Sequence, residues 1–262
     1  MISKAKIKYI NSLAYKKYRD QDKVFIAEGP KLISELENCF ELVEKFEGDD
    51  ADKLSLLNTP QQALAIFRQR EDNINKVKIA PSELYLMLSD IQNPGNLGTI
   101  IRLADWFGIE HIFCSTGCAD IYNPKTVQAT MGAIARVNVH YCDLLELLNS
   151  LNPSNPQNPQ NPQNSQNPQN PQNSLIPHLS PLTSYPIYGT FLNGENVYDS
   201  ELTEGGIIIM GNEGHGIPAE LAEKVNRRLL IPNYPIGRDT SESLNVAVAT
   251  AIICSEFRRR CK

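Results

Sequence analysis

The sequence predicts an α/β protein in which a small domain precedes a mostly parallel sheet covered by helices on both faces. From Glu83 onward, short β-rich runs alternate with segments of helical periodicity, which is the pattern of a parallel sheet. Runs such as Ile207–Met210 are continuously apolar, as expected for strands buried on both faces. The polar stretch 71–81 precedes this pattern, so we expect one domain over residues 1–75 and another over 82–262.

Six strands and five helices are expected in the second domain. The strands are predicted at residues 84–88, 111–115, 136–140, 187–192, 206–210 and 228–231, and the helices near 97–107, 124–133, 143–150, 218–226 and 243–258. Residues 152–174 interrupt the alternation with a near-regular Asn-Pro-Gln repeat. Because proline blocks helix and the tract offers nothing for a core, we expect a disordered surface insertion; a proline-recognition role is the alternative.

The first domain is predicted to begin with a Lys-rich helical stretch over residues 4–19. A short apolar segment follows at 24–27, and Pro30 suits the first turn of the next helix. Another helix is expected from Thr59, as its N-cap, to Arg70.

Composition excludes several classes of protein. The 262 residues carry a net charge of -5, which argues against non-specific DNA binding. The first 31 residues nevertheless carry eight basic and three acidic side chains, and the chain ends in Arg-Arg-Arg-Cys-Lys, so a basic edge could contact a polyanion. Solvated helix faces explain these charges equally well. No apolar run approaches the roughly 20 residues of a membrane helix. Six scattered cysteines and four histidines predict no structural zinc and a reducing cytoplasm.

The first of three chemically suggestive segments is Leu88–Gly108. A strand ends, a Pro-Gly turn follows, and Asn96 stands where an N-cap belongs. Arg102 lies off the apolar stripe of the helix, and its side chain can reach back toward Asn96. An amide and a guanidinium would then meet at the carboxyl edge of a sheet. The alternative is a simple cap and a solvent-exposed arginine.

The second segment, Ile207–Pro218, leads from a buried strand into three glycines within six residues. Glycines let backbone amides approach a ligand, although such a turn is often only a tight connection. The spacing is neither GxGxxG nor that of a P-loop. The carboxylate of Glu213 beside these amides is more suggestive.

In the third segment, Leu229–Cys254, Ser243 and Asn245 open a helix of small apolar residues. Its composition predicts a buried helix. The alternative to a functional role for Ser243 is that its side chain only caps this helix.

Together and in this order, the segments resemble the three signature motifs of the SpoU-type (TrmH-like) RNA ribose 2′-O-methyltransferases of the SPOUT superfamily. The matching residues are Asn96–Gly108, Gly211–Gly216, Ile231–Pro232 and Ser243–Asn245. The resemblance implies a catalytic domain with a deep trefoil knot. The segment Phe25–Lys31 also resembles the small substrate-binding domain that precedes the catalytic domain in many members.

The resemblance implies a site for S-adenosylmethionine and RNA, without a metal. The implied catalytic residues are Asn96, Arg102, Glu213, Ser243 and Asn245. The implied cofactor-binding residues are Met210, Gly211, Asn212, Gly214, Gly216, Ile231, Pro232, Ile236 and Leu244.

The implied reaction is methyl transfer to a ribose 2′-hydroxyl of rRNA or tRNA. Arg102 would carry it by binding a phosphate and stabilising charge on the 2′-oxygen, because a guanidinium stays protonated. Asn96 would orient Arg102, and Glu213 would hold Arg102 or the glycine-rich loop. RNA would bind the basic first domain. A cytoplasmic homodimer is expected, with no DNA or membrane partner.

Three positions depart from the family pattern: Asn93 replaces a common aspartate, and Gln128 and Thr130 replace an arginine and a serine in a segment that would contact RNA. The Asn-Pro-Gln insertion is not a family feature either. Three alternative functions remain. The first is a catalytically silent RNA-binding protein, the second a SPOUT base methyltransferase, and the third a nucleotide-dependent oxidoreductase, which the absence of GxGxxG disfavours.

Overall fold

The computed structural model describes residues 2–151, 185–235, 238–239, 241 and 243–260. Spatial contacts divide the chain into two compact units. The first comprises Met1–Glu71, Gln92–Asp105 and Ala119–Val137, and the second Asp72–Ile91, Trp106–Cys118 and Asn138–Lys262. The predicted domains, 1–75 and 82–262, are each continuous in sequence, whereas these units are not. The predicted boundaries therefore stay a prediction. The predicted insertion at 152–174 lies outside the described residues.

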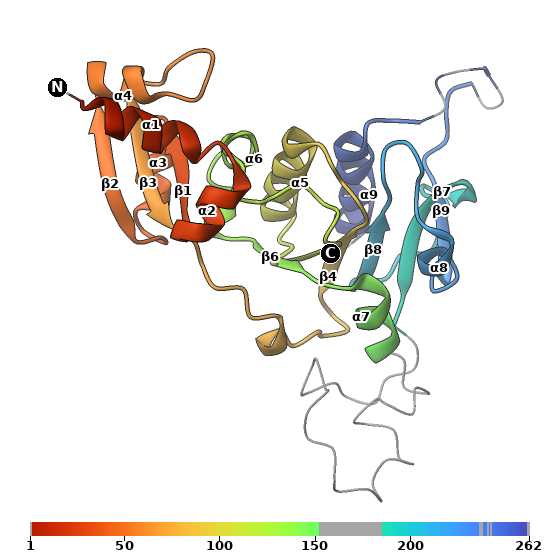
Figure 1. Ribbon diagram of the computed structural model, residues 1–262. Helices are drawn as coiled ribbons and strands as arrows, with labels where there is room; N and C mark the ends of the chain where they lie inside the picture. The colour runs from red at the N-terminus through yellow and green to blue at the C-terminus, as the bar shows by residue number, and fades with distance from the viewer. Residues whose placement is uncertain (1, 152–184, 236–237, 240, 242, 261–262) are drawn as a thin grey trace, which may run out of the picture. The chain divides into compact units, whose positions relative to one another are not determined.

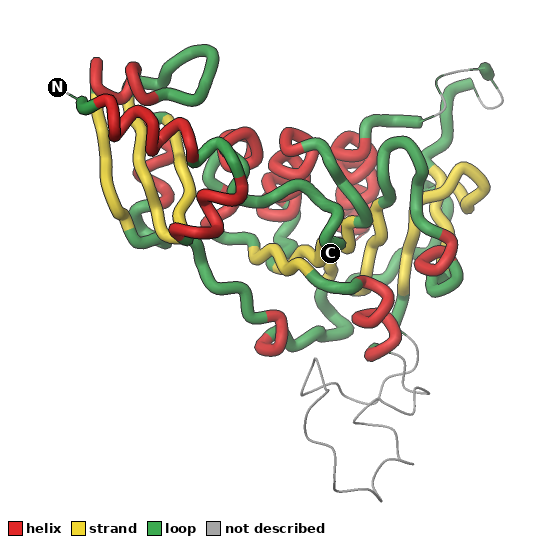
Figure 2. Tube along the Cα trace, in the orientation of Figure 1, coloured by secondary structure: helices red, strands yellow, loops and turns green. Residues whose placement is uncertain are grey.

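The first unit contains a three-stranded antiparallel sheet with the order β1-β3-β2 (Figures 1 and 2). Its strands are β1 (Val24–Glu28), β2 (Leu42–Glu47) and β3 (Ala63–Arg68). Its N-terminal helices are α1 (Lys4–Ser12), α2 (Lys16–Asp22), α3 (Pro30–Leu36) and α4 (Asp49–Leu54). The predicted Lys-rich helix is therefore two helices, because the chain turns at residues 13–15. The predicted strand at 24–27 and the helix start at Pro30 are confirmed.

The predicted helix from Thr59 to Arg70 is wrong, because these residues contain the central strand β3 of the small sheet. Residues Ala63 to Phe67 are all buried. A strand covered on both faces has no alternation of apolar and polar residues, so its sequence can be taken for part of a buried helix.

Two apolar clusters stabilise the first unit. Ile10 and Leu13 pack with Ile26, Leu54 and Ile66 in a cluster formed by the sheet, α1 and α4. An aromatic cluster includes Phe25, whose ring lies 5.1 Å from that of Phe40, 5.7 Å from that of Phe67 and 4.9 Å from that of Tyr122. Tyr122 comes from the later segment 119–137, which therefore contributes to this core.

Helices α5 (Pro94–Trp106) and α6 (Pro124–Thr130) pack closely at Gly98. A Cβ atom at Gly98 would lie 2.5 Å from the carbonyl oxygen of Thr126 and 2.6 Å from the Cβ of Ala129. Only glycine fits this contact, which gives Gly98, within the first motif segment, a structural role.

The second unit is built on a six-stranded parallel sheet with the order β6-β5-β4-β8-β7-β9 (Figure 1). The strands are β4 (Leu84–Leu88), β5 (His111–Cys114), β6 (Asn138–Tyr141), β7 (Ile187–Asn196), β8 (Gly206–Met210) and β9 (Arg227–Leu230). The described part of this unit also contains the α-helices α7 (Leu144–Ser150), α8 (Ala219–Ala222) and α9 (Val246–Arg260). The predicted parallel sheet is confirmed, with shifts of a few residues at some ends.

Both faces of this sheet are covered. On one face, Tyr85, Met87, Phe113, Ile207 and Ile209 pack against apolar residues of α7 and α8. The same cluster contains Leu151 and Tyr185, the residues that flank the undescribed segment 152–184. On the other face, Tyr188 of β7 meets Phe257 of α9 edge to face, with ring centroids 4.8 Å apart.

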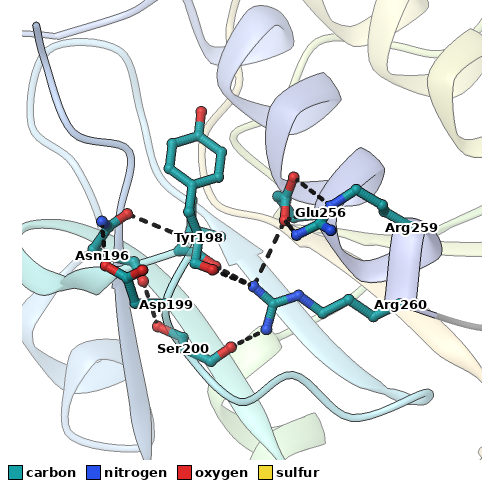
Figure 3. Close-up of polar contacts among 8 residues, drawn as sticks. Asn196, Tyr198, Asp199, Ser200, Glu256, Arg259 and Arg260 are labelled. Carbon is teal, nitrogen blue, oxygen red and sulfur yellow. Dashed lines mark hydrogen bonds and ion pairs between the residues drawn. The ribbon is translucent and has the colours of Figure 1, made fainter.

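The basic end of α9 is bound to the protein (Figure 3). Arg260 donates to the carbonyl oxygens of Val197, Tyr198 and Ser200, and Glu256 pairs with Arg259 at 2.8 Å. Arg258 donates to the carbonyl oxygens of Phe107 and Gly108, at 2.7 and 3.1 Å. Arg258 and Arg260 therefore anchor α9, whereas Arg259 pairs within the helix, so the charges of Arg258 and Arg260 are not simply solvated as one sequence interpretation held.

No helix within the described ranges is long and apolar enough to cross a membrane. The same residues contain no group of three or more His, Cys, Asp or Glu side chains arranged to hold a metal ion.

Candidate active site

The glycine-rich turn follows β8 directly at the carboxyl edge of the parallel sheet. Met210 is the last, buried residue of β8, and the backbones of Asn212 and Gly216 then pair through two hydrogen bonds of 3.0 and 2.9 Å. A Cβ atom at Gly211 would lie 2.3 Å from the carbonyl carbon of Gly216, so this position requires glycine. Nothing within 4 Å would meet a Cβ atom at Gly216, and Gly214 is exposed. The turn thus closes on itself and leaves its outer side open.

The side chain of Asn212 braces this turn. Its Oδ1 atom accepts hydrogen bonds from the backbone N–H groups of Gly214, at 2.8 Å, and His215, at 3.1 Å. Its Nδ2 atom donates to the carbonyl oxygen of Asp90 at 2.8 Å. Because the amide bonds within the protein at both ends, Asn212 would contribute to cofactor binding through the shape of the turn.

Asp90 lies at the end of β4, the strand next to β8. Its φ of 54° is left-handed, and its backbone N–H donates to Ser115 Oγ at 2.9 Å. The Ser115 hydroxyl in turn donates to Asp90 Oδ1 at 2.6 Å. This reciprocal pair fixes the carbonyl group that receives Asn212. Sequence reasoning missed both residues; their positions directly after two apolar strands were the available signal.

Cys118 lies beside this pair. Its Sγ atom accepts the Ile91 N–H at 3.3 Å and lies 3.7 Å from Ser115 Oγ. A hydrogen bond from Cys114 lowers the pKa of Cys118 to about 7, although partial burial opposes the shift. Burial raises the pKa of Cys114 well above its usual value. Cys118 is thus the more acidic thiol at this edge.

Helix α5 carries Asn96 and Arg102 in the first unit. The prediction that Asn96 is the N-cap is wrong. The helix begins at Pro94, and Asn93 Oδ1 accepts the N–H groups of Gly95 and Asn96, at 2.8 and 3.2 Å. Asn96 is therefore in the first turn, half-buried, and Arg102 is exposed two turns further on.

The third segment leaves β9 at Ile231 and Pro232, both half-buried. Ser243 and Leu244 are exposed and precede α9, whose first turn is capped by Asn245. Asn245 Oδ1 accepts the N–H groups of Ala247, at 3.0 Å, and Val248, at 3.3 Å. The cap that the sequence analysis considered for Ser243 is thus supplied by Asn245. Ile236 lies outside the described residues.

Within the second unit, the glycine-rich turn and Ile231 follow strands β8 and β9, which are separated only by β7. The remaining candidates divide between units. Asn96 and Arg102 belong to the first, whereas Glu213, Ser243 and Asn245 belong to the second. That all five meet in one catalytic site stays a prediction.

The donor set of the second unit suits a nucleoside ligand such as S-adenosylmethionine. The open turn at 213–216 offers backbone groups, and Ile217, Ile231, Pro232 and exposed Leu244 offer apolar surface. Glu213 supplies a carboxylate that a cationic ligand would favour. Gly214 and Gly216 lack side chains that would block approach.

A parallel sheet with a glycine-rich turn at its carboxyl edge is the arrangement in which many α/β proteins bind nucleotides and cofactors. Comparison with known families is more specific. The model of the SpoU rRNA Methylase family matches residues 83–167 and 168–255, and the chain belongs to this family. The model of the MRM3-like substrate binding domain matches residues 4–46.

Individual relatives agree. The 23S rRNA (guanosine(2553)-2′-O)-methyltransferase RlmP of Bacillus subtilis is 29% identical over 90% of this chain and 79% of its own length. The mitochondrial rRNA methyltransferase 3A of Danio rerio is 28% identical over 93% of this chain and 65% of its own.

Solved structures extend the likeness to the whole fold. A putative RNA methyltransferase of the TrmH family from Porphyromonas gingivalis is 34% identical, with a TM-score of 0.76 over 99% of both chains. An AdoMet-bound rRNA methyltransferase from Sinorhizobium meliloti is 25% identical, with a TM-score of 0.77 over 100% of this chain and 97% of its own. These likenesses confirm the SPOUT-type fold class and favour a methyltransferase over the oxidoreductase alternative.

Proposed function

We propose that this protein transfers a methyl group from S-adenosylmethionine to a ribose 2′-hydroxyl of RNA. The observation that carries the proposal is the SpoU match over 83–167 and 168–255, which contains all three motif segments. The Bacillus subtilis relative is named as a 2′-O-methyltransferase of 23S rRNA, which favours rRNA over tRNA as the substrate.

The cofactor, when bound, supplies a methyl group on a positively charged sulfur. The protein then has to hold the 2′-oxygen in line and stabilise the charge that develops on it. Arg102 is assigned this task. Its guanidinium stays protonated, so it acts by binding phosphate and the developing oxyanion rather than as a base. Its exposure on α5 leaves the side chain accessible to RNA.

The remaining site residues position this chemistry. Asn212 holds the glycine-rich turn in its closed form, so that the turn presents Glu213 outward. Asn245 uses its Oδ1 atom to cap α9 and thereby fixes the backbone of Ser243 and Leu244 just before the helix. Asn96, in the first turn of α5, is assigned to orient Arg102.

RNA recognition is assigned to the N-terminal part of the first unit. The MRM3-like substrate binding domain matches residues 4–46, and residues 1–31 carry the excess of basic side chains. The half-buried Gln128 of α6, where family members have an arginine, weakens the case for an RNA contact there.

We also propose a homodimer, a knotted catalytic domain and a cytoplasmic location. Leu244 and Val248 at the start of α9 are 49% and 50% exposed, which suits a subunit interface. Sedimentation equilibrium tests the dimer, and Val248→Asp should shift it toward monomer. The knot rests on the resemblance to the family, and the cytoplasmic location rests on the scattered cysteines of the sequence.

Incubation of the purified protein with labelled S-adenosylmethionine and rRNA or tRNA from a strain lacking it tests the reaction. Digestion of the product to nucleosides should place the label on ribose oxygen. Label on a base would favour a base methyltransferase instead. No incorporation into any RNA would favour the silent RNA-binding alternative.

A further inference from the structure

Two tyrosines stand out on α2 of the first unit. Tyr15, directly before the helix, is 68% exposed, and Tyr18 is 41% exposed. Residues three positions apart are neighbours on a helix surface. Large aromatic side chains normally bury most of their area, so a pair of exposed rings on one short segment marks a surface for binding.

The segment that carries these rings is rigidly held. Arg19 is only 1% exposed, and its Nη1 atom donates to the carbonyl oxygens of Leu13 and Ala14, both at 2.8 Å. Its Nη2 atom pairs with Asp120 at 2.5 Å. The arginine of this helix thus lies inside the unit while its tyrosines face solvent, the reverse of the usual distribution. Arg19 therefore fixes the two rings on the outside.

Basic side chains lie on the same segment as the tyrosines. The Lys17 ammonium lies 5.9 Å from the centre of the Tyr18 ring, and Lys16 neutralises Asp20 at 3.0 Å. Lys17 and Lys23 are exposed and form no ion pair with any residue that the structure describes. Exposed rings between unpaired positive charges match the chemistry of unstacked bases on a phosphate backbone.

On the basis of the proposed function, we infer that Tyr15 and Tyr18 form a stacking surface for unpaired bases of the RNA substrate, with Lys17 and Lys23 on the flanking phosphates. Stacking of this kind requires bases that are free of a duplex, so the surface selects a loop or single-stranded segment. A protein partner or a second copy of the chain is the competing occupant, since exposed tyrosines suit either.

The test uses the full chain and two 12-nucleotide probes, a single-stranded RNA carrying 2-aminopurine and its blunt duplex. Tyr15→Ala/Tyr18→Ala removes two stacked bases and should weaken binding of the single strand by about 30-fold or more, abolish the fluorescence quenching, and leave the duplex unaffected. Tyr15→Phe/Tyr18→Phe keeps both rings and should bind normally. Tyr198→Ala removes a 46% exposed tyrosine of the other unit and is the matched control.

The lysines are tested through salt dependence. Lys17→Ala/Lys23→Ala should reduce the slope of log affinity against log salt for the single strand by about 1.4, since each phosphate contact contributes about 0.7. In methylation assays with rRNA, the double alanine variant of the tyrosines should raise KM and leave kcat unchanged.

Wild-type affinity of the Tyr15→Ala/Tyr18→Ala variant for the single strand would overturn the inference, as would an equal loss for the duplex. A change in oligomeric state with unchanged RNA binding would assign the surface to a protein partner. If the wild-type protein binds the probe through these rings but methylates no RNA, the proposed function fails and the stacking surface stands.

Discussion

The hydrogen bonds of the Asn212 side chain allow a quantitative prediction about cofactor binding. Asn212→Ala removes three hydrogen bonds of 2.8, 3.1 and 2.8 Å, two to amides of the turn and one to the Asp90 carbonyl group. The amides of Gly214 and His215 are exposed and regain water, so their loss costs about 0.5 kcal/mol each, whereas the partly buried Asp90 bond is worth about 1 kcal/mol. The closed turn should lose about 2 kcal/mol relative to open forms.

If the cofactor binds the closed turn, this shift should raise the dissociation constant of S-adenosylmethionine by up to about 30-fold, since 1.4 kcal/mol is a factor of ten. Isothermal titration calorimetry measures the change directly. Hydrogen exchange at Gly214 and His215 should accelerate in the same variant, because both amides lose their acceptor.

Asn226→Ala is the matched control. Asn226 accepts the Ile187 N–H at 3.0 Å and donates to the Tyr185 carbonyl oxygen at 2.9 Å, at the opposite, amino edge of the same sheet. The Asn226→Ala variant should lose about as much stability as Asn212→Ala and keep the cofactor affinity of the wild type. Affinity within twofold of wild type for Asn212→Ala, or an equal loss for Asn226→Ala, would refute the reasoning.

Four further predictions concern single residues. Arg102→Ala should abolish methyl transfer while cofactor affinity, measured by calorimetry, stays within a few-fold; near-normal turnover would contradict its assigned role. Arg19→Ala should lower the free energy of unfolding by about 3–5 kcal/mol in urea titrations, because Asp120, whose side chain is 10% exposed, loses its partner; a loss below 1 kcal/mol would count against a buried ion pair. Burial, and secondarily the charge of His140, lowers the pKa of His111 from 6.5. On acidification the unfolded chain therefore binds a proton at this position before the folded protein does, so the free energy of unfolding should fall as the pH drops below about 6.5. His111→Gln should flatten that dependence, and an unchanged slope would argue against this assignment. Alkylation of Cys118 by iodoacetamide should rise with a midpoint near pH 7, as its pKa of about 7 implies, and mass spectrometry of the peptide would expose a midpoint near 9 instead.

The sequence allowed the large sheet to be predicted because its strands are short, apolar and separated by helices. The order of the strands within the sheet could not be predicted from the sequence. β4 pairs with β8, whose sequence lies more than a hundred residues away, and no local pattern encodes that pairing. Burial on both faces also concealed β3, whose run of apolar residues fits a helix as well as a strand.

The segments that carry the candidate site could be predicted from the sequence. The local roles of individual residues, such as helix caps, were harder to predict. Proline is favoured at the first position of a helix, and Pro94 with Asn93 before it was the available signal against Asn96 as the cap. Asp90 and Ser115 were missed because their bond joins the ends of two strands, which only the paired sheet brings together. The arginines of the C-terminal helix were interpretable only once their carbonyl acceptors were known.

The position of Leu151 and Tyr185 in one apolar cluster bears on how this chain tolerates change. Tyr185 lies two residues before β7, whereas the glycine-rich turn follows the end of β8. Because Leu151 and Tyr185 are held in one core, each doubling of a flexible connection between them would cost only about 0.6 kcal/mol in closure entropy. We therefore expect the sequence between Leu151 and Tyr185 to change in length at little cost to folding, which would make this junction a suitable place to insert foreign sequence.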